Sequence, residues 1–175
     1  RLATPAWHIH GGQPPAEDAH LSYNILLNLA GVCNTEDKEV LWHFISRYRP
    51  DATPANAPTL DKLTEYAVEY FRDFVKPHKE YRAPTDQERA ALEDLVETLT
   101  GLPADSAAED IQTQVYEVGK RHDFENLKDW FKALYETLLG QSTGPRMGSF
   151  IALYGVDETK ALIGRVLSGE DLGAA

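Results

Sequence analysis

The chain has 175 residues, of which 42% are hydrophobic and 26% charged, and its formal net charge is −11. This composition is typical of a soluble globular protein and excludes a collagen, a disordered chain and a membrane-spanning helix. Taken alone, the acidic balance argues against nucleic acid as a partner, and we expect no DNA partner. A single cysteine, Cys33, excludes a disulfide framework and favours a reducing compartment, so we expect a cytoplasmic protein. Because no run approaches eighteen apolar residues, we also expect no membrane partner.

Residues 1–19 are predicted to form an irregular arm or linker, because three prolines and two glycines disfavour a helix there. His8 and His10 could bind one metal ion together only in an extended chain, and no nearby pair of ligands accompanies them. We therefore expect no metal site.

Residues 20–83 show three apolar runs at helical spacing, over residues 21–29, 40–48 and 63–75. Asn34 or Thr35 is expected to cap the second of these helices. Prolines follow the second and third runs and end them.

Residues 84–175 begin with a predicted capping box at Thr85 and Glu88. A second capping box is predicted from Ser106 to Glu109. Further helices are expected over residues 127–139, from about 145 to 154 and over 157–167, the last one capped by Asp157.

No stretch shows the alternation of a strand. About eight helices with short connections predict an all-α fold, a helical bundle in two small halves at residues 20–83 and 84–175.

No phosphate-binding glycine loop, nucleophile elbow or zinc-protease motif occurs, so no catalytic residue is expected. Trp42, Arg47 and Arg49 lie close together along one predicted helix and its end. An aromatic ring near arginines can stack a base and hold phosphates. Core packing is the alternative for Trp42, because neighbouring aromatic residues follow the inward face.

A polar loop between two predicted helices is the most distinctive local feature, with the sequence GQSTGPRMG at residues 140–148. Pro145 is favoured in the first turn of a helix, where backbone amide donors are free. Arg146 adds a planar fork of donors that can bond a base or a phosphate. The alternative is a capped turn whose arginine bonds the carbonyls of the preceding helix.

Residues 135–155 resemble the C-terminal segment of class I lysyl-tRNA synthetases. Residues 7–11, 22–30 and 115–120 resemble the same family, so the resemblance covers nearly the whole chain and is most specific over 139–155. The family joins a catalytic domain with ATP-binding signatures to an all-helical anticodon-binding domain. The resemblance implies that this chain is the second of these, an α-helix cage shared with glutamyl-tRNA synthetases.

The resemblance also implies which residues contact RNA. It places a base-reading turn at Gln141, Ser142, Thr143, Pro145, Arg146 and Met147. The candidates for a basic patch beside it are Arg47, Arg49, Lys120, Arg121 and Arg146, with Trp42 as a stacking residue.

The implied partners are the anticodon loop of lysine tRNA and the enzyme's own N-terminal catalytic domain. ATP and magnesium are implied as cofactors of the whole ATP-dependent ligase. Neither catalytic signature occurs in this chain, so we expect the chain alone to hold no cofactor and to leave lysine unactivated.

The negative charge does not exclude RNA, because it is concentrated between Asp86 and Glu117, where nine acidic residues accompany one arginine. Such a segment is typical of a solvated face, and unpaired bases are read by stacking and edge contacts that need few cations. Two alternatives remain open: a helical protein-interaction domain, and the equivalent domain of a glutamyl-tRNA synthetase.

Overall fold

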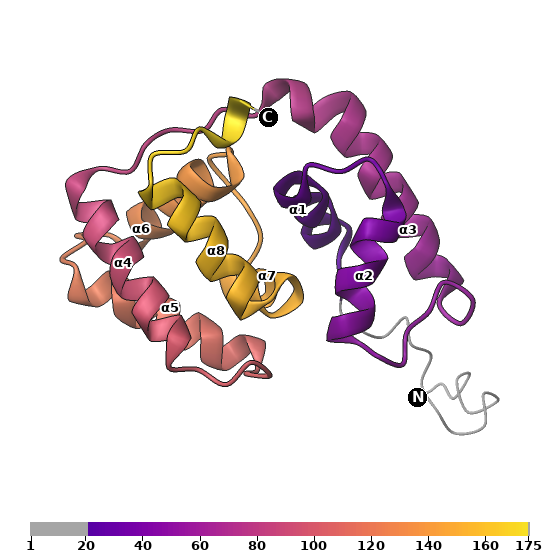
Figure 1. The fold of residues 1–175 in the computed structure, drawn as a ribbon, viewed down its shortest axis with the longest axis horizontal. Coiled ribbons are helices and arrows are strands. Elements are labelled where there is room, and N and C mark those ends of the chain that lie inside the picture. The colour runs from indigo at the N-terminus through magenta and orange to yellow at the C-terminus, as the bar shows by residue number, and fades with distance from the viewer. Residues whose placement is uncertain (1–20, 175) are drawn as a thin grey trace.

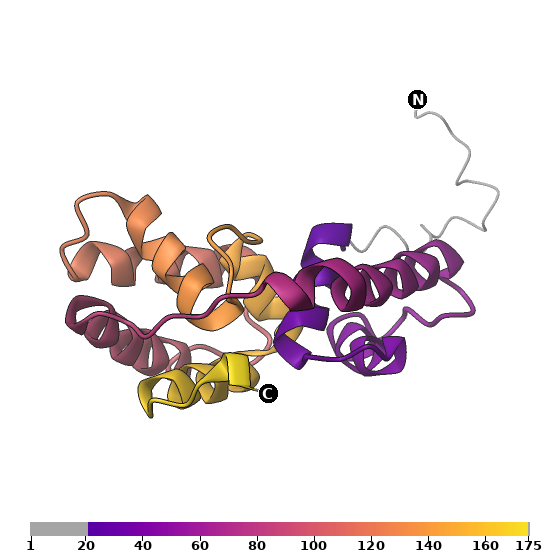
Figure 2. The ribbon, with the colours of Figure 1, turned by 90° about the horizontal axis from the view of Figure 1, so that it is seen from above.

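A computed structural model describes residues 21–174 of the chain (Figures 1 and 2). Across this range the chain is helical and contains no strand, which confirms the all-α prediction. The α-helices are α1 (Tyr23–Cys33), α2 (Lys38–Tyr48), α3 (Pro58–Tyr70), α4 (Asp86–Thr100), α5 (Ala108–Arg121), α6 (Leu127–Leu134), α7 (Met147–Tyr154) and α8 (Val156–Leu167). The predicted arm, with His8 and His10, lies outside the described residues.

Two of the α-helices continue into π-helical turns. Phe71–Val75 extends α3 and is followed by a 3₁₀ turn at Lys76–His78, while Tyr135–Leu139 extends α6. A further 3₁₀ turn spans Leu172–Ala174. Helices α3 and α6 are therefore each extended without a break by a wider, π-helical turn.

The capping box at Thr85 is confirmed: the Glu88 amide donates to the Thr85 hydroxyl, and the Thr85 amide donates to the Glu88 carboxylate at 2.9 Å. The predicted box at Ser106 is wrong. Helix α5 begins one residue later, with Ala107 at its N-cap and no side-chain bond there. The Ser106 hydroxyl instead donates to the Pro103 carbonyl, so it stabilises the preceding turn.

Two other predicted caps are also wrong. Asp37 caps α2, because Asn34 adopts the left-handed conformation that ends α1. Gly155 occupies the N-cap of α8, and Asp157 lies in the first turn, where its charge favours the helix dipole.

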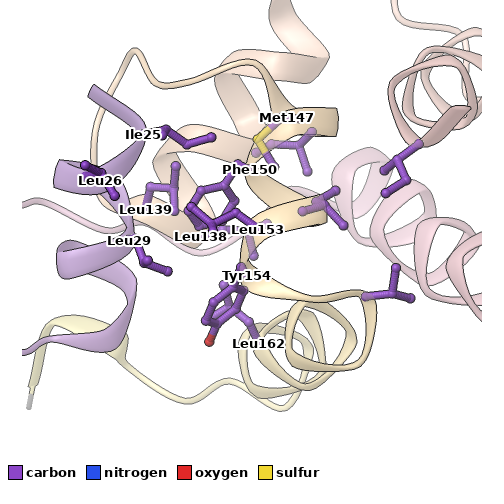
Figure 3. Close-up of a cluster of buried hydrophobic side chains, with 14 of the residues drawn as sticks. Ile25, Leu26, Leu29, Leu138, Leu139, Met147, Phe150, Leu153, Tyr154 and Leu162 are labelled. Atoms are coloured by element: carbon purple, nitrogen blue, oxygen red, sulfur yellow. The ribbon is translucent and has the colours of Figure 1, made fainter. Parts of the chain in front are cut away.

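Helices α1–α3 lie to one side of the molecule and α4–α8 to the other (Figure 1). One hydrophobic core runs through both groups. Figure 3 shows its middle, where α1 meets the π-helical turn after α6 and helix α7. The buried side chains labelled there are Ile25, Leu26, Leu29, Leu138, Leu139, Met147, Phe150, Leu153, Tyr154 and Leu162.

The segment between the two groups is fixed against the π-helical turn at Tyr135–Leu139. The Glu80 amide donates to the Gly140 carbonyl at 3.0 Å. The Arg82 guanidinium contacts the carboxylates of both Glu88 and Glu136 at 2.7 to 3.0 Å. These bonds fix the end of the π-helical turn that extends α6. They therefore also fix the start of the loop that follows it.

Helices α5 and α7 pack with their backbones close together. The Gly148 amide donates to the Gln112 side-chain oxygen at 2.6 Å. A β-carbon at residue 148 would meet the Ala108 carbonyl oxygen and would lie 2.8 Å from the Gln112 backbone nitrogen. Glycine is therefore required at this crossing for close approach.

Candidate nucleic-acid interface

The loop at residues 140–146 is anchored at its first two residues. Gly140 has a φ of 70°, a left-handed conformation that favours glycine, and its backbone faces the Tyr81 ring. The side-chain nitrogen of Gln141 donates to the Asn28 side-chain oxygen at 2.8 Å, which ties the loop to α1. Gln141 therefore positions the loop.

The last part of the loop rests on Tyr135. The Tyr135 hydroxyl donates to the Pro145 carbonyl at 2.9 Å, and the backbone at Gly144 lies over the ring. Burial raises the pKa of Tyr135, so the hydroxyl stays protonated as a donor at neutral pH. Between these two anchors, Ser142 and Thr143 are exposed.

A groove of about 350 Å³ opens beside this loop. Its walls carry the aromatic rings of Tyr116, Phe131 and Tyr135 and the side chains of Lys128 and Lys132. Residues 142–144 close one side. Tyr116 is 40% exposed and stands edge-on to Phe131, with ring centroids 5.0 Å apart. Both lysines are exposed and have no ion-pair partner among the described residues.

The groove keeps its shape because α6 is fixed against α5. The Trp130 indole donates to the Val115 carbonyl at 2.9 Å in the core. Gly119 lets that ring approach, since a β-carbon there would lie 2.5 Å from it. With Trp130 pointing inward, Lys128, Lys132 and the rings beside them face outward, so α6 is amphipathic.

Arg146 follows the loop at the N-cap of α7. Its side chain is exposed and makes no hydrogen bond or ion pair within residues 21–174. The alternative prediction, that this arginine bonds the carbonyls of the preceding helix, is therefore wrong. An unpaired guanidinium at the end of the loop that borders the groove can bond an anion or a base edge.

Two predicted loop residues are not at the surface. Met147 is 1% exposed and lies in the core shown in Figure 3. Pro145 is also buried, and its carbonyl is used by Tyr135. The amide donors expected to be free at the start of α7 are partly used, because Gln112 accepts from Gly148.

Trp42 and Arg47 hold the fold. Trp42 is 6% exposed and its indole donates to Asp61 at 2.9 Å, so its ring faces the core and not the groove. The Arg47 guanidinium donates to the Tyr154 carbonyl at 2.6 Å, at the end of α7. It also lies over the Phe44 ring.

The other three predicted cations are paired. Arg49 contacts Asp51 through two hydrogen bonds of 3.0 and 3.1 Å. Arg121 contacts Asp94 in the same bidentate way. Lys120 lies 3.4 Å from Glu117 and keeps 60% of its side chain exposed. Of the predicted set, the structure therefore brings only Ser142 and Thr143 to the lining of the groove. Arg146 lies exposed at the N-cap of α7, next to the loop.

Sequence reasoning missed the five side chains that line the groove. Lys128, Lys132 and Tyr135 are spaced at i, i+4 and i+7, opposite the apolar face of α6, and this spacing could have identified a shared outer face. Tyr116 lies on another helix, and no sequence pattern places it beside Phe131.

Within the described part of the chain, no cluster of three or more histidine, cysteine or acidic side chains is arranged for a metal ion. No helix there is long and apolar enough to cross a bilayer.

No family model matches the sequence, and no solved structure matches it. Curated proteins do match. The chain is 52% identical over 164 residues to a protein of Rickettsia bellii, and 50% identical over 164 residues to one of Rickettsia akari. It is 53% identical over 170 residues to a protein of Roseobacter denitrificans.

All three relatives are named lysine–tRNA ligase. The matches cover 93 to 97% of this chain but only 31 to 32% of each relative. The chain thus spans about a third of the length of these ligases, and its likeness to that third is close enough to imply the same fold there.

Proposed function

We propose that the chain is the anticodon-binding part of a class I lysine–tRNA ligase, and that the groove beside residues 142–144 receives anticodon bases. The observation that carries the proposal is the combination of aromatic walls, two unpaired lysines and the unpaired Arg146 around one loop. Tyr116 and Phe131 offer faces and edges for stacking, and Arg146 offers a planar donor fork.

The sequence relatives support the same proposal. Their shared name implies a protein that acts on tRNA, and the matched third of their length is the helical part described above. The resemblance of residues 139–155 to class I enzymes supports the class. In this proposal the two halves, residues 20–83 and 84–175, form one α-helix cage.

The rest of the parent enzyme would supply the chemistry. ATP and magnesium would be held there, where lysine is joined to tRNA through an adenylate in the cytoplasm. The role of this chain is to bind and orient the anticodon loop. Its partners are lysine tRNA and the enzyme's own catalytic domain.

The roles of the lysines can be tested by salt titration. Lys132→Gln removes one unpaired cation from the groove, so we expect lysine tRNA to bind about threefold more weakly at moderate salt. The slope of log affinity against log salt should become shallower by about 0.7, the value for one contact to a single strand. RNAs with different anticodons should be affected alike, because a phosphate contact carries no sequence information.

The matched control is Lys160→Gln on α8, which lies at the opposite edge of the molecule from α6 in Figure 2. This variant should bind like the unmodified chain and keep its salt dependence. Equal slopes for Lys132→Gln and the unmodified chain would remove the groove from the RNA-binding surface.

A further inference from the structure

An aromatic stripe on α3 and its π-helical turn is exposed at the surface. It consists of Tyr66, Tyr70 and Phe74, spaced four residues apart and exposed by 53%, 45% and 60%. Tyr23, in the first turn of α1, stands edge-on to Tyr70 with ring centroids 6.3 Å apart. Phe74 lies 5.0 Å from Tyr70, centroid to centroid. We name these four residues the aromatic stripe.

The backbone presents this stripe outward. In the π-helical turn at Phe71–Val75, Phe71 is completely buried while Phe74 is more than half exposed. Wider turns of this kind are rare and occur frequently at functional sites. Burying rings of this size would stabilise a fold, so their exposure calls for a partner.

The stripe is linked to the loop at residues 140–146 through α1. Gln141 of the loop contacts Asn28 of α1, and Tyr23 lies five residues earlier on that helix, about 7.5 Å along its axis. In Figure 2 the first turns of α1 and the loop before α7 lie along the same edge of the molecule. Among the six large hydrophobic side chains that are exposed in the described chain, four belong to the groove or the stripe.

The stripe also differs from the acidic segment in its charge balance. Between Lys62 and Lys76 there are three acidic and three basic residues, whereas residues 86–117 carry nine acidic residues and one arginine. Lys62, Arg72 and Lys76 flank the rings and pair only with exposed carboxylates, which hold them weakly. A neutral aromatic surface with cations beside it is suited to stacking unpaired bases while phosphates contact the cations.

We infer that the aromatic stripe is a second RNA contact, which stacks unpaired bases of the same anticodon loop that the groove binds. This inference rests on the proposed function and adds a separate surface to it. The groove would receive bases on one side of the loop, and Tyr70 and Phe74 would stack bases on the other. A protein partner is the competing occupant, and the link through α1 to the loop and the cations beside the rings favour RNA.

The test uses the whole 175-residue chain and a hairpin that carries the anticodon loop of lysine tRNA. Tyr70→Leu and Phe74→Leu should each weaken hairpin binding about fivefold or more, because each removes a stacking ring. Tyr70→Phe keeps the ring and should bind like the unmodified chain. Tyr48→Leu, which removes a tyrosine of similar exposure from α2, is the matched control and should change nothing.

A fluorescent adenine analogue, placed at one loop position at a time, reports stacking directly. At one or more positions its emission should fall when the unmodified chain binds and should stay high with Phe74→Leu, while Lys132→Gln preserves the quenching. Leucine is at least as good a helix former as tyrosine or phenylalanine, so both stripe variants should keep α3 and stay folded at the temperature of the binding measurement. Thermal unfolding measures what the lost ring contacts cost in stability.

Full hairpin affinity in both leucine variants would overturn the inference and would assign the stripe to a protein partner. An equal loss in Tyr48→Leu would overturn it too. If the unmodified chain does not bind lysine tRNA, the proposed function fails as well. If Lys132→Gln weakens binding and the stripe variants do not, only this inference fails.

Discussion

Replacing Arg146 by alanine is expected to weaken the binding of lysine tRNA by about 5- to 150-fold. This range corresponds to the 1–3 kcal/mol that a bidentate contact to a base edge contributes, by analogy with duplex readout. The guanidinium is exposed and has no partner in residues 21–174, so its removal breaks no described contact of the fold. The melting temperature should therefore stay nearly unchanged.

The specificity of Arg146→Ala distinguishes base reading from a phosphate contact. The preference for lysine tRNA over an anticodon-swapped tRNA should become smaller, whereas a lost phosphate contact weakens both RNAs alike. Arg146→Lys keeps the charge but not the planar fork, so it should restore affinity more than discrimination. Unaltered discrimination in Arg146→Ala would assign the arginine no role in reading the anticodon.

Gly148→Ala is expected to lower the free energy of unfolding by about 3 kcal/mol, and thus the melting temperature by about 6–12 °C. The added β-carbon would lie 2.7 Å from the Gln112 β-carbon and would meet the backbone of α5. Backbone atoms cannot rotate away as a side chain can. The helices must separate, and the bond between the Gly148 amide and Gln112 is weakened with them.

Gly164→Ala is the matched control for this packing effect. Gly164 lies within α8, and a β-carbon there would have no neighbour within 4 Å. Alanine is the better helix former, so this variant should be more stable by about 0.5–1 kcal/mol. Thermal unfolding followed by circular dichroism measures both variants. Equal melting temperatures for Gly148→Ala and the unmodified chain would show that α5 and α7 do not pack this closely.

The helices were predictable because apolar spacing and capping are local properties of the sequence. The Thr85 box is an example, since both of its bonds join residues three apart. The Ser106 box failed because its hydroxyl had a competing acceptor in the Pro103 carbonyl. A pattern indicates that a side chain can cap a helix, but it does not exclude the other acceptors within reach.

The site was predictable only where residues that are consecutive in the sequence form it. The loop at residues 140–146 is contiguous, so its position was predictable. Its anchors were not, because Gln141 and Pro145 are held by partners on other helices and at Tyr135. Trp42 has the aromatic ring that a stacking residue needs. Its indole, however, donates a hydrogen bond to Asp61, 19 residues away, and the ring is held in the core. The groove depends on α5 and α6 meeting, and only the packing of Trp130 against Val115 shows that.

The central claim is that this chain reads the lysine anticodon through the loop and groove. The most direct measurement is the affinity of the unmodified 175-residue chain for lysine tRNA and for the same tRNA with an exchanged anticodon, at one stated salt concentration. We expect tighter binding of the lysine anticodon, by about tenfold or more for each base that is read with a good bidentate contact. Equal affinity for the two tRNAs, or no binding of either, would contradict it.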